Sequence, residues 1–153
     1  MPLDDADRHY LDLAIAEATA GLGAGGIPIG AVLVADGDVL GAGHNQRVQL
    51  GSAIRHGETD ALEKAGRQAA AVYARSTMYT TLSPCHMCTG AILLYGIPRV
   101  VIGENTTFLG AEDLLRSHGV EVVVADDPRC TELMTSFIAD RPDLWFEDIG
   151  EVS

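Results

Sequence analysis

Two short segments of the sequence bring together residue types that bind metals and move protons: His56-Gly57-Glu58 and Pro84-Cys85-His86-Met87-Cys88. Cys85 and Cys88 are three residues apart, so in a helix they share one face and its first turn. The helix dipole and the free N–H groups of that turn favour the thiolate form, which is the form that binds metals. Taken alone, this pair is compatible with a metal site, a redox pair or two buried thiols.

His56 adds a third donor and shifts the balance toward a catalytic zinc site. One histidine and two cysteines leave a tetrahedral zinc ion with one open position for water. Two thiolates and a neutral imidazole bring the net charge of such a site to about zero, and the ion can lower the pKa of its water to about 7.

Glu58 lies two residues after His56, and in a regular helix its side chain would point about 200° away. We therefore place the pair at a helix entry, where Gly57 permits an irregular backbone. There Glu58 could face the water as general base and then general acid instead of binding the metal. The alternatives are a surface or core histidine at position 56 and an acid at position 58 that only stabilises the first helical turn.

A four-ligand structural zinc site is the competing metal interpretation, and a non-catalytic, metal-stabilised interaction domain stays open with it. Cys130 or His44 could supply a fourth ligand, but neither lies in a ligand-like pair. His86 should point away from a metal that both neighbouring cysteines bind. The odd total of three cysteines, with two in C-x-x-C spacing, argues against a disulfide framework.

The elements that must position these residues begin with a hairpin and continue as strand–helix units, which predicts an α/β fold with a mixed sheet and helices on both faces. Asp36-Gly37-Asp38 predicts the hairpin turn, and Ser83-Pro84 and Asp127-Pro128 predict capped helix starts. With no repeat or linker, residues 1–153 are expected to form a single domain. We predict helices over about 5–22, 57–71, 84–95, 112–117 and 128–139, strands over about 29–35, 39–43, 77–81, 99–103 and 121–125, and a polar stretch over 46–55.

The charge of the chain argues against a nucleic-acid partner. Ten basic and 22 acidic residues give a formal net charge of −12, and no two basic residues are adjacent. Proteins that grip a phosphate backbone need clustered cations. No apolar run approaches the roughly 20 residues of a membrane helix, and residues 1–5 are acidic where a secretory signal is basic. We expect a cytoplasmic protein with no membrane partner.

An H-x-E segment followed by P-C-x-x-C, with 85 − 56 = 29 positions between His56 and Cys85, is the pattern of zinc-dependent nucleobase deaminases. The chain resembles the cytidine deaminase-like superfamily and, within it, the fungal cytosine deaminases over about residues 11–151. The segments that carry this closer resemblance are 25–30 (GGIPIG), 43–45 (GHN), 56–58 (HGE), 80–85 (TTLSPC), 89–92 (TGAI), 95–99 (YGIPR) and 143–151 (DLWFEDIGE).

The resemblance implies a fold, a reaction and a set of roles. The fold is a three-layer α/β/α sandwich around a mixed five-stranded sheet, in a homodimer. The reaction is hydrolytic deamination of a free base, cytosine to uracil and ammonia. One Zn²⁺ per chain would be the cofactor. Its ligands would be His56, Cys85 and Cys88, and Glu58 would shuttle protons.

The resemblance also implies how the base is recognised. Asn45 and the Gly57 N–H would bind the ring carbonyl and adjacent N–H, and Asp148 would accept from the exocyclic amine. The apolar walls and lid would be Ile27, Leu82, Phe108 and Trp145. From the residues alone, Asn45 is equally compatible with a turn, Asp148 with a solvated carboxylate and Phe108 with the core, whereas the adjacent aromatics Trp145 and Phe146 indicate packing.

Alternatives within the same chemistry are another small amino-heterocycle (creatinine, isocytosine, 5-methylcytosine, a triazine or guanine), a nucleoside, and a tRNA adenosine. The chain departs from the fungal pattern at Val48, Arg55, Thr59 and Asp60. We expect Asp60, one turn into its helix, to add negative charge near the site.

Overall fold

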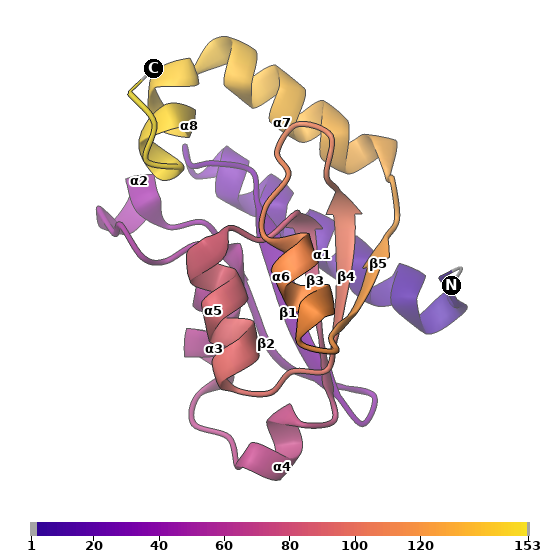
Figure 1. Ribbon diagram of the computed structural model, residues 1–153. Helices are drawn as coiled ribbons and strands as arrows, with labels where there is room; N and C mark the ends of the chain where they lie inside the picture. Colours follow the sequence, from indigo (N-terminus) through magenta and orange to yellow (C-terminus); the bar gives the residue numbers. More distant parts are fainter. Residues whose placement is uncertain (1–2, 153) are drawn as a thin grey trace.

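The computed structural model describes residues 3–152 and is built on a mixed five-stranded sheet of order β2-β1-β3-β4-β5 (Figure 1). β1 pairs antiparallel with both β2 and β3, whereas β3–β4 and β4–β5 are parallel. β2 therefore runs parallel to β3, and four of the five strands end at the same edge of the sheet. The strands are β1 Gly30–Ala35, β2 Asp38–His44, β3 Ser76–Leu82, β4 Arg99–Glu104 and β5 Glu121–Val124.

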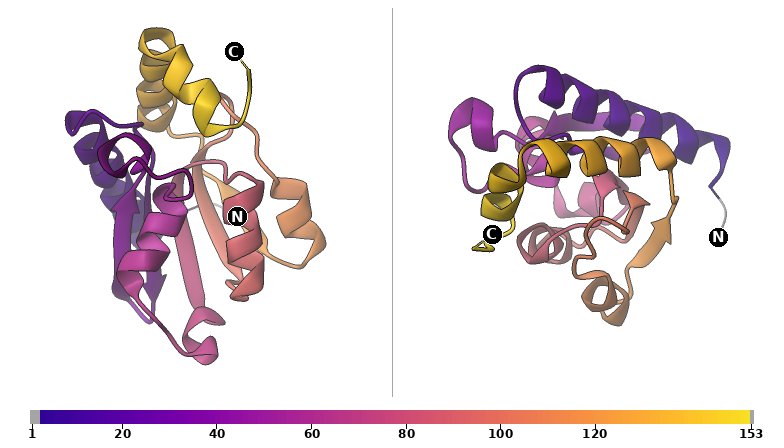
Figure 2. Two further views of the ribbon diagram at one scale, coloured as in Figure 1. Left: turned by 90° about the vertical axis from the view of Figure 1, so that its left-hand side faces the viewer. Right: turned by 90° about the horizontal axis from the view of Figure 1, so that it is seen from above.

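Helices cover both faces of the sheet, so the predicted three-layer α/β/α sandwich is confirmed (Figure 2). One face carries α1 (Asp5–Gly23) and α7 (Pro128–Asp140), and the other carries α3 (Gly57–Ala65), α5 (His86–Leu94) and α6 (Glu112–Ser117). Short helices α2 (Arg47–Leu50), α4 (Ala70–Tyr73) and α8 (Pro142–Asp148) lie in the connections and at the end of the chain. Across residues 3–152, none of the helices combines the length and apolar character needed to cross a membrane.

Strand β1 shows why two apolar cores form. All six of its residues are buried. Ala31 and Leu33 belong to the core that also holds residues of α3, α5 and α6, whereas Val32 and Val34 belong to the core under α1. Successive side chains of a strand point to opposite faces, so a continuous apolar run buries both faces of the sheet.

Several predicted boundaries need correction. The helix predicted over 57–71 ends at Ala65, because Gly66 adopts a positive φ of 73° and α4 begins separately at Ala70. Helices α2 and α8 were not predicted. Ser83-Pro84 does not cap a helix: Cys85 is the N-cap of α5, and the Ser83 hydroxyl donates to Glu112 instead (2.6 Å).

Two local predictions are confirmed. Asp36 and Gly37 both have positive φ (55° and 77°), as a two-residue hairpin turn of type I′ requires. Asp127 caps α7 by accepting from the Arg129 N–H, with Pro128 in the first turn. The single-domain interpretation of 1–153 stays a prediction, and residues 1–2 and 153 lie outside the described residues.

A buried ion pair ties α1 to the sheet. Asp7 accepts from Arg99 at 2.7 and 2.9 Å and from the Tyr79 hydroxyl at 2.7 Å. The hydrogen bond from Arg99 is the main reason that the pKa of Asp7 falls to about 2, although burial opposes the fall. The buried carboxylate of Asp7 in α1 therefore binds Tyr79 in β3 and Arg99 in β4, and so holds the helix against both strands.

Replacing Asp7 by Asn should lower the free energy of unfolding by about 2 kcal/mol at pH 7, since each unit of pKa shift corresponds to about 1.4 kcal/mol. The folded-state pKa is depressed below the unfolded value near 3.9, so the stabilisation is complete above that value and disappears as the pH falls through about 2. Urea unfolding of both proteins between pH 7 and about pH 2 measures this convergence. The control is Asp5→Asn, on the exposed side of the same helix, which should change little at any pH; an equal effect of both substitutions would refute the assignment.

Candidate active site

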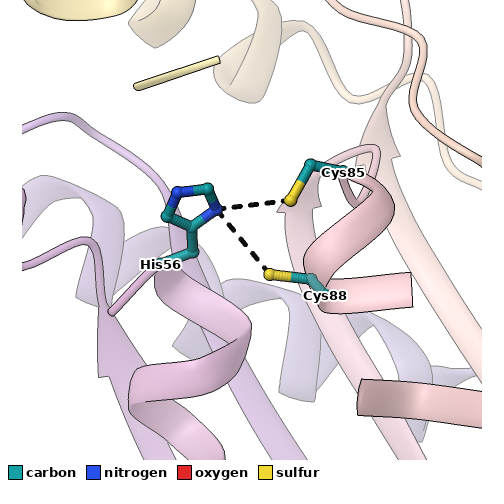
Figure 3. Close-up of side chains that lie close together, drawn as sticks. All are labelled: His56, Cys85 and Cys88. Carbon is teal, nitrogen blue, oxygen red and sulfur yellow. Dashed lines mark hydrogen bonds between the residues drawn. The ribbon is translucent and has the colours of Figure 1, made fainter. Parts of the chain in front are cut away.

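The three predicted metal donors meet at the sheet edge where β2 and β3 end. His56 is the N-cap of α3 and Cys85 is the N-cap of α5, both with extended backbone (ψ 175°), and Cys88 lies in the first turn of α5. An extended cap residue turns its side chain off the helix axis, so two helix starts can aim their side chains at one point. Figure 3 shows the His56 ring facing both sulfur atoms.

The separations of these donors fit a zinc ion. His56 Nδ1 lies 3.5 Å from Cys85 Sγ and 3.7 Å from Cys88 Sγ, and all three atoms fall within 4.8 Å of one another. Zn–N bonds of about 2.0 Å and Zn–S bonds of about 2.3 Å at the tetrahedral angle place nitrogen and sulfur about 3.5 Å apart. The donor set and its spacing therefore match a zinc site with three protein ligands.

The opposite nitrogen of the His56 ring is also held. Nε2 lies 3.2 Å from Asp148 Oδ1, whose side chain is only 2% exposed. A ring that donates from Nε2 presents a lone pair at Nδ1, which is the tautomer that a metal needs. Asp148 thus orients a metal ligand, a role that sequence reasoning did not assign to it.

The thiols and the imidazole polarise one another when no ion lies between them. A hydrogen bond from Cys88 and contact with His56 lower the pKa of Cys85 to about 4, despite burial. Burial opposes a charge on His56, but hydrogen bonds to Asp148 and Cys85 outweigh it and raise the pKa of the ring to about 10. The pKa of Cys88 is raised by its hydrogen bond to Cys85 and by burial. One thiolate is thus available at neutral pH.

Glu58 lies in the first turn of α3 and is 4% exposed. Its side chain lines the same pocket as His56 and Cys85. Burial, followed by the charge of Cys85, raises the pKa of Glu58 to about 7. A carboxyl group with a pKa near neutrality can both accept and donate a proton at physiological pH.

The pocket is small, with a cavity of about 20 Å³, roughly the space that one water molecule needs. Phe108 and Trp145 meet edge to face with ring centroids 5.7 Å apart. The pocket is lined by Ile29, His56, Glu58, Leu82, Ser83, Cys85, Phe108, Trp145, Asp148 and Ile149.

Three of the four predicted wall residues, Leu82, Phe108 and Trp145, are among the residues that line the pocket, and Ile29 lines it as well. Ile27 is fully buried in the same apolar cluster as Ile29, Leu82 and Trp145. Its predicted role toward the base stays a prediction.

Asn45 and Gly57 lie beside the pocket and not among its lining residues. Asn45 is fully buried, and its Nδ2 donates to Asp148 Oδ2 at 3.1 Å. Gly57 lies so close to β1 that a Cβ atom would meet the Ile29 carbonyl oxygen at 3.2 Å. The geometry therefore joins Asn45 to Asp148 and gives Gly57 a packing reason in addition to any role toward a ligand.

Asp60 does not supply a free negative charge near the site, contrary to our expectation. It is fully buried and accepts from the His44 N–H (3.0 Å), from Arg55 Nε (3.0 Å) and from Lys64 (3.2 Å). These contacts outweigh burial and lower the pKa of Asp60. Its charge is balanced by two cations, one of which directly precedes the metal ligand His56.

The candidates for a fourth ligand lie elsewhere. His44 Nδ1 contacts Glu17 at 2.9 Å, Cys130 is buried beside Gly103, and His86 is exposed. In residues 3–152, the only cluster of three or more metal-binding side chains of this kind is His56, Cys85 and Cys88. This arrangement favours the three-ligand site over the structural one.

Sequence reasoning missed four residues that the structure brings to the site: Ile29, Arg47, Ser83 and Ile149. Trp145, Asp148 and Ile149 have helical spacing, so a helix predicted over the last residues would have pointed to Ile149. Nothing in the local pattern around Arg47 marks it, because its partners lie about 100 residues away.

Comparison with known proteins agrees with this geometry. The family model for the cytidine and deoxycytidylate deaminase zinc-binding region matches residues 4–104. The cytosine deaminase of Candida albicans is 55% identical over 146 residues, covering 95% of this chain and 97% of that protein. A tRNA-specific adenosine deaminase of Streptococcus pyogenes is 36% identical over 145 residues, covering 87% of this chain and 90% of that protein.

The fold agrees as well. A solved structure from a study of tRNA:A34 deaminases that edit the wobble position of transfer RNA matches with a TM-score of 0.72 and 28% identity, over 82% of this chain and 99% of that one. The three donors and Glu58 all lie within the matched residues 4–104. The chain therefore belongs to the family of the cytidine and deoxycytidylate deaminase zinc-binding region.

Proposed function

We propose that the protein is a zinc-dependent hydrolase that deaminates a free nucleobase, converting cytosine into uracil and ammonia. The observation that carries this proposal is a buried proton-transferring carboxylate, Glu58, in one small pocket with His56, Cys85 and Asp148. The 55% identity to a protein named cytosine deaminase supports the choice of base. Such a reaction would place the protein in pyrimidine salvage in the cytoplasm.

His56, Cys85 and Cys88 would hold the zinc ion, which, when bound, lowers the pKa of a water molecule and so supplies a nucleophile at neutral pH. Glu58 accepts the proton of that water and passes it to the ring nitrogen beside the amine-bearing carbon. The water oxygen bonds to this carbon, which becomes tetrahedral. Glu58 then takes the remaining proton from the added hydroxyl and delivers it to the amine, the C–N bond breaks, and the nitrogen leaves as ammonia while the C=O bond of uracil forms. The pKa of Glu58 near 7 suits both directions of transfer.

Asp148 and Asn45 would recognise the base. Asp148 would accept from the exocyclic amine before that amine leaves. Asn45 uses one N–H of its amide on Asp148 and one lone pair of Oδ1 on the Arg47 N–H, so one donor and one acceptor stay available for a ring edge. A site that bonds the whole edge of a small ring rejects analogues that would leave these buried groups unpaired.

Replacing Glu58 by Ala should reduce kcat at least about 100-fold, because general acid–base catalysis is worth roughly 10²–10⁴-fold. Zinc content should stay at one ion per chain, since the three donors are untouched. Ammonia release and metal analysis on the same preparation measure both quantities. The matched control is Glu63→Ala, an exposed acid on the same helix; activity within tenfold of wild type in Glu58→Ala would contradict the proposed role.

A substrate panel tests the choice of base. We expect rapid ammonia release from cytosine and at least about 100-fold lower kcat/KM for cytidine, because Phe108, Trp145 and Ile149 line a small pocket and would leave no room for ribose. Guanine, isocytosine, creatinine and an adenosine-containing anticodon stem-loop should react slowly or not at all. Faster turnover of any of these than of cytosine would keep the Glu58 mechanism and refute the specificity.

We also propose a homodimer. Large apolar side chains are exposed on and beside helices α5 and α6, which lie on the same face of the sheet: Met87, Leu94 (73% exposed), Tyr95, Leu109 and Leu114. A second copy that covers these side chains would remove apolar surface from water.

Sedimentation of the zinc-loaded protein tests the dimer. We expect the mass of two chains for the wild type and of one chain for Leu94→Glu, because a buried charge at a self-complementary contact is introduced twice. Leu22→Glu, on α1 away from this face, is the control and should stay dimeric. A monomeric wild type would refute the dimer and leave the proposed reaction intact.

A further inference from the structure

Helix α8 contributes three of the pocket's residues from one of its faces. Trp145, Asp148 and the C-cap Ile149 are spaced i, i+3 and i+4 and all line the pocket. The helix is seven residues long and lies at the end of the described chain (Figure 1). Helices this short are not stable by themselves, so contacts with the rest of the fold must hold α8 in place.

The polar contacts that hold α8 are concentrated on three residues. Among residues 3–152, the side-chain hydrogen bonds and ion pairs that join α8 to the rest of the fold all reach Asn45, Arg47 or His56. His56 serves the metal site, and Asn45 is proposed to bind the base. Arg47 is the cation of the group and has no role in the mechanism derived so far.

The guanidinium of Arg47 forms hydrogen bonds with the last turn of α8. Its Nε donates to Asp148 Oδ1 at 2.7 Å, and a terminal nitrogen donates to Glu147 at 3.0 Å. The side chains of Arg47 and Asp148 are 16% and 2% exposed, whereas that of Glu147 is 61% exposed. A buried, charge-assisted bond is strong and an exposed ion pair is weak, so the contact with Asp148 is the effective one.

The backbone of Arg47 holds the second recognition residue. Its N–H donates to Asn45 Oδ1 at 2.9 Å, while Asn45 Nδ2 donates to Asp148 Oδ2 at 3.1 Å. These two bonds define which end of the Asn45 amide is donor and which is acceptor. Arg47 therefore touches both side chains that would recognise the base.

The buried carboxylate of Asp148 needs this cation to stay where it is. Asp148 Oδ1 lies 3.2 Å from His56 Nε2 and 2.7 Å from Arg47 Nε. A histidine that binds a metal is neutral, so Arg47 supplies the permanent positive charge beside this carboxylate. A buried charge that loses its partner is costly, and a side chain near the end of the chain can relieve the cost by turning outward. Because Trp145 and Ile149 share the helix with Asp148, outward movement would also open the pocket.

We propose that Arg47 is a positioning residue that holds Asp148, and through it α8, over the pocket. With Arg47 in place, Asp148 faces the amine of the base, and Trp145 and Ile149 close the apolar side. The kinetic part of this inference rests on the proposed deaminase function, and the structural part does not.

The structural part is tested by the exposure of Trp145, the one tryptophan of the chain. In the zinc-loaded protein, Arg47→Gln should raise acrylamide quenching of its fluorescence at least about twofold, because local opening exposes a buried ring. The control Arg141→Gln removes an arginine whose ion pair with Asp143 is exposed at the start of the same helix, and it should leave quenching unchanged. If Arg47→Gln does not fold, Arg47→Lys serves in its place. It keeps the positive charge but cannot bind two carboxylates through separate guanidinium nitrogens, so it should raise quenching to a smaller extent. Unchanged quenching in the folded variant would overturn the inference.

The kinetic part is tested by a double-mutant cycle on kcat/KM for cytosine. Arg47→Gln should lower kcat/KM by about 10- to 100-fold, as expected for a misplaced binding group. In an Asp148→Asn background the same change should cost less than about threefold, because Arg47 then has no charge to position. Independent, additive losses at the two sites would show a general structural role and overturn the inference.

The two tests separate the failure of each proposal. If the wild type does not deaminate cytosine, the proposed function fails, and the quenching series still decides whether Arg47 holds α8. If the wild type is active and Arg47→Gln matches it in both kcat/KM and quenching, the inference fails and the proposed function stands.

Discussion

The convergence of two helix N-termini on one edge of the sheet is the constraint on which the site depends. β2 and β3 run in the same direction on either side of β1, so α3 and α5, which follow them, both begin at that edge. Cap residues with extended backbone then bring His56 Nδ1 to 3.5 and 3.7 Å from the two sulfur atoms. A change in the direction of either strand would move one half of the donor set to the far end of the molecule.

Asp148 connects this metal site to the end of the chain. One oxygen contacts His56 and Arg47, and the other accepts from Asn45, so one buried carboxylate links the three-donor site, Asn45 and α8. The arrangement explains why a helix of seven residues can serve as a wall of the pocket. Under the proposed function, recognition of the base and orientation of the metal ligand would be coupled through the same charge.

Much of the architecture follows from local sequence patterns, and the exceptions have identifiable causes. Strand and helix positions are largely as predicted because apolar periodicity and turn residues such as Asp36-Gly37 act locally. The helix after His56 is shorter than predicted because Gly66 adopts a positive φ that ends it. The spacing of apolar residues does not predict such a backbone change. The role of Ser83 was misassigned because its hydroxyl donates to Glu112, 29 residues away in sequence, and does not cap the helix next to it.

The sequence by itself indicated the chemistry of the site, because the donor types and spacing within His56-Gly57-Glu58 and within Cys85–Cys88 are set inside one helical turn. Only the tertiary structure decided which residues surround that chemistry. His56 meets the two cysteines, Ile29 lines the pocket, the charge of Asp60 is balanced by Arg55, and Arg47 meets Asp148 across 101 positions of sequence. The physical reason is that burial and ion pairing depend on distance in space, which is set only when segments far apart in the sequence pack together.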